Sequence, residues 1–114
     1  MGASAIAFIH ERDAVHRHRA ARHWDIVRDI LLRRVPAHEV WAFGSRVKGT
    51  ARKYSDLDLC VVTRQPLDLS LRAILAEDFA ESDLPWKVDV VDWATTSEAF
   101  RKIVESDRVV LQRP

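Results

Sequence analysis

The sequence predicts an α/β fold in which a small mixed sheet of three strands is flanked by about four helices. Segments with apolar residues three and four positions apart alternate with short runs rich in valine, leucine and tryptophan. Alternation of this kind is typical of a sheet covered by helices. The chain has 114 residues, with neither an internal repeat nor a Ser/Gly-rich linker. We therefore expect one domain that spans residues 1–114.

Four helices are predicted from apolar spacing and from end signals. The segment 11–34 carries apolar residues at helical spacing and stops just before a proline. A short helix could follow over 45–49. The apolar residues of 71–79 predict a second amphipathic helix. A last helix is expected after Thr95 and Glu98, which have the spacing of a capping box.

Three strands are expected between these helices. The segments 39–43, 56–63 and 87–93 are short and apolar, with β-branched or aromatic residues. A helix separates the second strand from the third, so these two can run parallel. The connection between the first and second strands is too short to predict their relative direction.

The composition is that of an ordinary globular domain, with 47% hydrophobic and 31% charged residues. The single cysteine, Cys60, excludes an intrachain disulfide and a cysteine-based zinc site, and its apolar surroundings predict burial. No apolar stretch approaches the roughly 20 residues that cross a bilayer. The first ten residues have no basic leader. We expect a cytoplasmic protein that does not contact the membrane.

The net charge of +1 hides an uneven distribution of charge along the chain. Residues 46–53 include four basic side chains and no acidic one, whereas residues 55–100 include ten acidic and three basic ones. A basic loop directly before an acidic strand suits a site that holds polyphosphate and cations together. Four acidic residues interrupt the basic helix 11–34, which argues against direct nucleic-acid binding by that helix.

Asp56 and Asp58 are the first candidate metal ligands. Residues two apart on a strand point to the same face, so both carboxylates project together while Leu57 and Leu59 face the core. Adjacent carboxylates repel each other unless a cation lies between them, and oxygen ligands of this kind suit Mg²⁺. An isolated Asp-x-Asp is more often an ordinary edge strand.

Gly44 and Ser45 make the metal interpretation more specific. A glycine between a strand and a helix permits close backbone approach to a ligand, and the start of a helix offers N–H groups to a phosphate. Taken alone, the pair would be a plain turn with a serine N-cap. Together with the aspartate pair, it predicts a phosphate cradle beside a metal site.

A third carboxylate is needed to hold a metal near an acceptor hydroxyl. Asp89 is the preferred candidate, because an aspartate within an apolar strand is costly unless it is paired or bound to metal. Asp92 is the competitor and has the opposite facing. Its position at the strand end favours an exposed or capping role.

Gly44-Ser45, ten intervening residues, Asp56-Leu57-Asp58 and the later Asp89 together resemble the polymerase-beta-like nucleotidyltransferase superfamily. The full string Gly-Ser-Arg-Val-Lys-Gly-Thr-Ala-Arg-Lys-Tyr-Ser-Asp-Leu-Asp-Leu is similar to its minimal branch, the MNT domains. The resemblance covers roughly residues 24–111 and implies a small mixed sheet flanked by helices.

The resemblance also implies roles for single residues. The turn before the short helix would hold the triphosphate, and Arg46 matches a basic position that often follows the serine. The pair Asp56 and Asp58 would hold the metals, and Asp89 the metal on the acceptor side.

The function implied is that of an enzyme, which transfers AMP from ATP, or from another nucleoside triphosphate, to a hydroxyl. Similar minimal domains are paired with helical HEPN-type toxins, so a tyrosine of such a toxin is the expected acceptor and this chain the antitoxin. One alternative is a binding module in which catalysis is weak or lost. Another is a subunit that modifies a small molecule presented by a helical substrate-binding partner.

Overall fold

The fold is described from a computed structural model, for residues 14–52 and 55–114. Its elements, in chain order, are α2 (Ala14–Arg34), β1 (Val40–Phe43), α3 (Ser45–Lys48), β2 (Leu57–Val61), α4 (Leu69–Ala80), β3 (Val88–Asp92), the 3-10 helix η1 (Trp93–Thr95), α5 (Glu98–Asp107) and β4 (Val109–Gln112). The predicted α/β alternation is confirmed. The part of the first predicted helix at 11–13, and residues 53–54 of the basic loop, lie outside the described residues.

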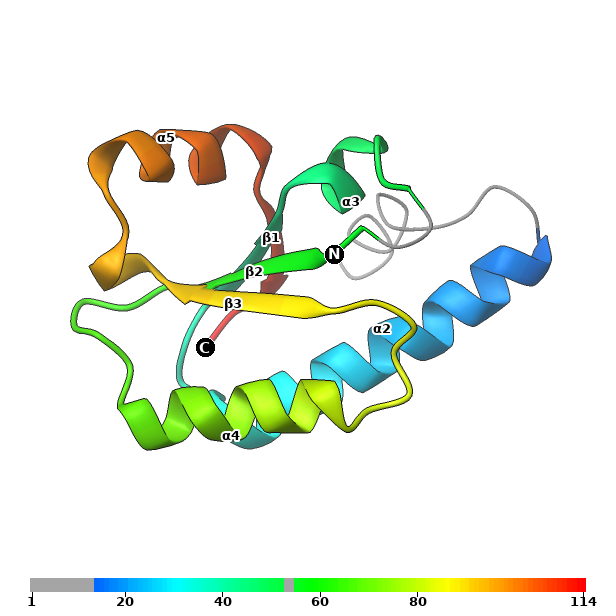
Figure 1. Cartoon of the computed structure of the whole chain (residues 1–114), viewed down its shortest axis with the longest axis horizontal. Helices are drawn as coiled ribbons and strands as arrows, with labels where there is room; N and C mark the ends of the chain where they lie inside the picture. The colour runs from blue at the N-terminus through cyan, green and yellow to red at the C-terminus, as the bar shows by residue number, and fades with distance from the viewer. Residues whose placement is uncertain (1–13, 53–54) are drawn as a thin grey trace.

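The sheet is mixed and has four strands in the order β3-β2-β1-β4 (Figure 1). β2 and β3 run parallel, as the intervening helix predicts, and β1 is antiparallel to both β2 and β4. The prediction of three strands was wrong, because β4 is a four-residue segment, three of them apolar, directly behind a helix. Pairing with β1 makes it a strand, and the Gln112 side-chain amide donates to the carbonyls of Val35 and His38 at 2.9 and 3.0 Å.

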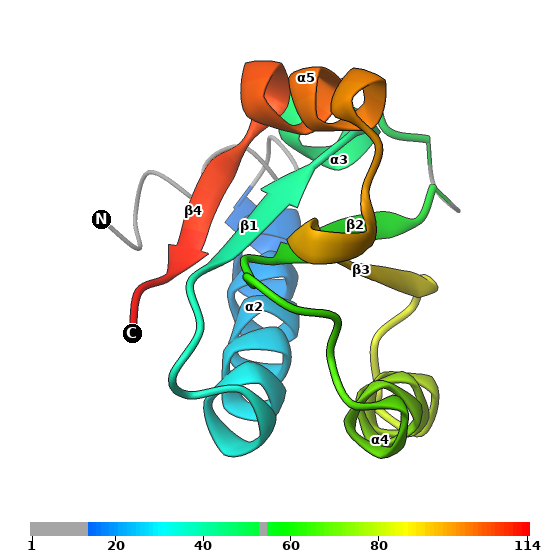
Figure 2. The same ribbon diagram turned by 90° about the vertical axis from the view of Figure 1, so that its left-hand side faces the viewer.

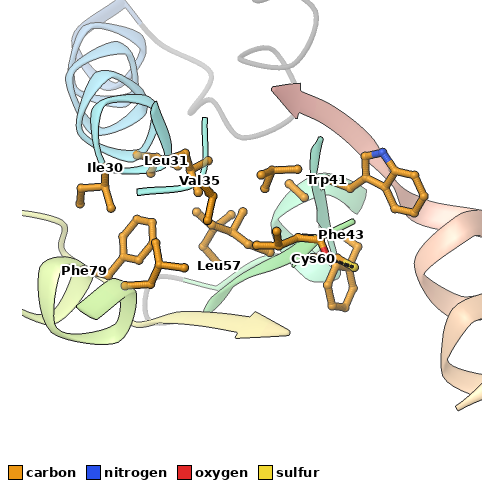
Figure 3. Close-up of a cluster of buried hydrophobic side chains, with 14 of the residues drawn as sticks. Ile30, Leu31, Val35, Trp41, Phe43, Leu57, Cys60 and Phe79 are labelled. Carbon is orange, nitrogen blue, oxygen red and sulfur yellow. Dashed lines mark hydrogen bonds between the residues drawn. The ribbon is translucent and has the colours of Figure 1, made fainter. Parts of the chain in front are cut away.

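Helices cover both faces of the sheet. α2 and α4 lie on one face, and α3 and α5 on the other (Figure 2). The two-residue period of β2 turns Leu57, Leu59 and Val61, all fully buried, toward α2 and α4. In Figure 3 the side chain of Leu57 lies near Val35 and Phe79. The α2/α4 side of β2 is therefore wholly apolar, whereas its other face carries Asp58 ahead of the buried Cys60.

The caps of α4 and α5 set where these helices begin. The Asp68 carboxylate accepts hydrogen bonds from the N–H groups of Ser70 and Leu71, at the start of α4. The Ser97 hydroxyl accepts from Phe100 N–H at 3.1 Å, so the N-cap of α5 is Ser97 rather than Thr95 of the predicted capping box. No helix within the described residues is both long and apolar enough to cross a membrane.

Asp92 is a buried structural residue at the end of β3. Its side chain has no exposed surface, which contradicts the expected exposed role. It accepts hydrogen bonds from Leu67 N–H at 2.6 Å and from the Thr95 hydroxyl, and the Arg72 guanidinium lies 3.6 Å away. Burial favours a higher pKa, but these hydrogen bonds and the Arg72 charge outweigh it and lower the pKa of Asp92. Asp92 thus joins β3 to α4 and to the β2–α4 loop.

This network predicts a pH-dependent loss of stability in Asp92→Asn. Because the pKa of Asp92 is lower in the folded state, its carboxylate stabilises the fold above the unfolded pKa, and that contribution is lost as the pH falls through the folded pKa. We expect the variant to lose about 2 kcal/mol of unfolding free energy near neutral pH. The loss should shrink below about pH 4. Urea unfolding of the wild type and the variant, near neutral pH and below about pH 4, measures this loss. An equal loss at both pH values would contradict the stabilising role of the Asp92 carboxylate.

Candidate active site

The turn after β1 brings the chain against a carboxylate of β2. Gly44 has φ +86°, in the region that favours glycine, and its carbonyl accepts from the N–H groups of Val47 and Lys48 as α3 begins. A Cβ atom placed on Gly44 would overlap Oδ2 of Asp58. Only a glycine leaves room for this contact, so the predicted phosphate-binding turn and the predicted metal pair lie side by side.

Two carboxylates share one face of the sheet, and a third precedes them in the chain. Asp58 is paired in register with Phe43 of β1 on one side and with Asp89 of β3 on the other. Asp56, just before β2, lies two residues from Asp58 and is half-buried, as Asp58 is. Burial raises the pKa of Asp58, and the charges of Asp89 and then Asp56 raise it further. The structure therefore brings all three predicted carboxylates within electrostatic reach of one another.

The competitor for the third position lies on the opposite face. Asp92 is three residues beyond Asp89 and points toward α4, whereas Asp89 is exposed beside Asp58. The predicted opposite facing of these two residues is therefore confirmed. Because its oxygens already bind protein groups, Asp92 does not belong to the carboxylate group of the other face.

The carboxylates fit a metal that binds together with its substrate. Among residues 14–52 and 55–114, no three His, Cys, Asp or Glu side chains form a ready-made metal cage. Burial, and then repulsion by the neighbouring carboxylates, raises the pKa of Asp58 while no cation is bound. Mg²⁺ usually takes one or two carboxylates and completes its shell with water and substrate phosphates. An oxygen-only donor set beside a glycine turn matches that requirement.

Arg46 has structural contacts that the sequence did not reveal. Only 7% of its surface is exposed, and its Nε donates to the Ser55 carbonyl at 2.8 Å. A second guanidinium nitrogen lies 3.4 Å from the Arg52 carbonyl, and the group stacks on the Trp86 ring at 4.5 Å. Arg46 thus ties the loop before Asp56 to the segment before β3. Its predicted contact with a phosphate stays a prediction, and no motif spacing could have indicated these backbone partners.

A glycine turn against paired carboxylates, on a mixed sheet, is an arrangement suited to nucleotidyl transfer. Residues 24–111 match the family model for the nucleotidyltransferase domain. The chain belongs to this family, whose chemistry typically depends on a divalent metal.

The chain is similar to particular members of MNT–HEPN systems. It is 60% identical, over 87 residues and 76% of each chain, to a Haemophilus influenzae protein described as "Probable protein adenylyltransferase MntA". A toxin–antitoxin crystal structure with AMP-PNP matches 80% of this chain and 73% of its own, at 28% identity and a TM-score of 0.68. A structure of an AMPylated Shewanella oneidensis HEPN toxin in complex with an MNT antitoxin matches 82% of this chain and 72% of its own. The sequence identity is 26% and the TM-score is 0.63.

Two glycines of positive φ allow a matched test of the Gly44 contact. A Cβ at Gly49 (φ +79°) would meet nothing within 4 Å, whereas one at Gly44 would strike Asp58. We expect Gly49→Ala to cost about 1 kcal/mol of stability and to keep Mg-ATP affinity. Gly44→Ala should lose more stability and at least tenfold in affinity, a difference of about 1.4 kcal/mol. Urea unfolding and calorimetry measure both, and equal affinities in the two variants would refute the contact.

Asp58→Asn should separate stability from ligand binding. Because the pKa of Asp58 is raised in the folded state, its charge destabilises the fold increasingly as the pH rises through that pKa. The neutral amide of the asparagine removes this charge, so the metal-free variant should melt no lower than the wild type at neutral pH. If Asp58 holds the metal, Mg²⁺-dependent ATP binding should be abolished. Thermal melting in EDTA and calorimetry with Mg-ATP test it. Unchanged metal-dependent binding would sink the assignment.

Proposed function

We propose that this protein transfers AMP from ATP to a hydroxyl of a helical HEPN-type toxin, with a tyrosine as the preferred acceptor, and so acts as its antitoxin. The observation that carries the proposal is the register that sets Asp89 beside Asp58 while Gly44 lies against the Asp58 carboxylate. The similarity to a protein adenylyltransferase, and to an antitoxin found with an AMPylated toxin, supports the acceptor class.

The residues divide the work between the nucleotide and the acceptor. Gly44 and Ser45 would receive the triphosphate, with Arg46 holding the loop that follows. Asp56 and Asp58 would hold Mg²⁺ on the nucleotide, and Asp89, exposed at the next strand, would serve the acceptor side. The bound metal supplies charge neutralisation on the phosphates and lowers the pKa of the acceptor hydroxyl.

The reaction is a single displacement at the α-phosphorus. The acceptor oxygen forms a bond to that phosphorus, and the bond from phosphorus to the pyrophosphate oxygen breaks. The hydroxyl proton passes to solvent, which reaches the site because Asp89 is exposed. Orientation of the acceptor accounts for several kcal/mol of the barrier. A domain of this size has little surface left to enclose an acceptor, so a partner that presents the hydroxyl is expected.

A helical HEPN-type toxin serves as the partner in the test of transfer. Intact-mass spectrometry after incubation with Mg-ATP should show the partner gaining adenylyl mass. Asp56→Asn should abolish the gain because a metal ligand is lost. Asp25→Asn, the same change at an exposed position of α2 on the other side of the sheet, should leave it intact.

In the same assay, Asp89→Asn should lower the rate of transfer more than the affinity for Mg-ATP, since the ligands on the nucleotide side remain. No gain on the partner, together with efficient modification of a small hydroxyl compound by this chain alone, would refute the proposal and support the small-molecule alternative. Mg-ATP binding without transfer to either would leave a nucleotide-binding module.

A further inference from the structure

The sheet has a free edge at the strand that carries Asp89. β3 is the terminal strand in the order β3-β2-β1-β4. Leu57 N–H donates to the Lys87 carbonyl at 2.9 Å, so Lys87 and Asp89 direct their backbone groups toward β2. By the alternation along a strand, the N–H and C=O groups of Val88 and Val90 point outward, where none of the described residues binds them. Outward backbone groups of this kind are a template for another strand.

A groove runs along this edge, between β3 and α4. It has a volume of about 620 Å³. Its α4 wall is formed in part by Ala76 and Ala80, whose small side chains leave the space open, and its floor is apolar at Phe79 and Leu84. Lys87 and Arg72 add positive charge, the latter already paired with the buried Asp92.

Asp89 belongs to both the groove and the carboxylate face. Its side chain lies on the face of Asp58, whereas its strand forms a wall of the groove. A peptide added to the edge would alternate its side chains in the same way as β3. A residue level with Asp89 would project onto the carboxylate face, and its two neighbours would enter the groove beside Ala76 and Ala80.

We propose that the edge of β3 and the α4–β3 groove bind the acceptor polypeptide as an added strand, with the hydroxyl residue on the carboxylate face and small apolar residues on either side of it in the groove. This inference rests on the proposed function and specifies its substrate: an extended segment rather than an isolated hydroxyl compound. Backbone pairing supplies affinity and the groove supplies side-chain selectivity, as in other strand-addition complexes.

A pair of variants on α4 tests the groove. Ala76→Trp places a large ring in it, whereas Ala73→Trp makes the same change at an exposed position of α4 that does not line it. We expect Ala76→Trp to lower transfer to the partner at least tenfold, while Mg-ATP affinity and Tm stay at the level of Ala73→Trp. Equal transfer by the two variants would overturn the inference. So would a selective loss of Mg-ATP affinity in Ala76→Trp, which would make the groove a nucleotide subsite.

Synthetic acceptors test the backbone pairing. The probe is acetyl-Lys-Thr-Val-Tyr-Val-Thr-Lys-amide, compared with N-acetyl-tyrosinamide, and we expect the peptide to be modified at least ten times faster. The peptide is then N-methylated either at the tyrosine or at the two residues that flank it. The N–H groups lost in these two variants point to opposite edges of the added strand. One of these two changes should lower transfer by about tenfold and the other should not, because only one set pairs with β3.

The possible outcomes separate the two proposals. Equal rates for the peptide and N-acetyl-tyrosinamide, or no effect of either methylation, would overturn the strand-addition inference while transfer itself remains. Absence of transfer from the wild-type protein to the partner and to both probes would overturn the proposed function and this inference together.

Discussion

The close contact between the Gly44 backbone and the Asp58 carboxylate is the constraint on which the site depends. It requires a positive φ at Gly44, the antiparallel register that sets Phe43 opposite Asp58, and a turn short enough to start α3 at once. If β2 slipped by one residue, Asp58 would point into the α2/α4 core and a leucine would face the turn. The buried side of the sheet therefore fixes the position of the polar side.

The two faces of the sheet hold their carboxylates in opposite ways. On one face, Asp58 has its pKa raised by burial and by like charges, so its carboxylate is held at a cost to the fold. On the other, Asp92 has its pKa lowered by hydrogen bonds that outweigh burial, so its carboxylate strengthens the fold. Destabilisation of the kind seen at Asp58 is expected where a charged ligand binds, since the ligand relieves it.

Sequence patterns predicted those features that depend on spacing along the chain. The opposite facing of Asp89 and Asp92 follows from the two-residue period of strands, and the parallel pairing of β2 and β3 follows from the intervening helix. β4 was missed because three apolar residues and a glutamine behind a helix show no two-residue period, and only the pairing with β1 makes them a strand. The burial of Asp92 was missed because its partners include a backbone N–H of a distant loop.

Arg46 shows the same limit at the site itself. A basic residue behind a glycine turn suggests a ligand contact, yet its guanidinium binds carbonyls of the loop leading to Asp56 and stacks on Trp86. A contact to a main-chain oxygen does not depend on which side chain the partner residue carries, so the sequence does not indicate it. Only the folded arrangement reveals them.

The pairing of β4 with β1 has a consequence for synthesis on the ribosome. β1 carries the turn at Gly44 on its end, yet one of its two neighbours is the last described element to leave the ribosome. Strand pairs so far apart in sequence form late, because the intervening chain must first be brought together. A nascent chain that stalls before β4 would therefore expose one side of β1 and hold the glycine turn loosely. Competence to bind a nucleotide would then appear only once β4 has emerged and paired, rather than gradually during synthesis.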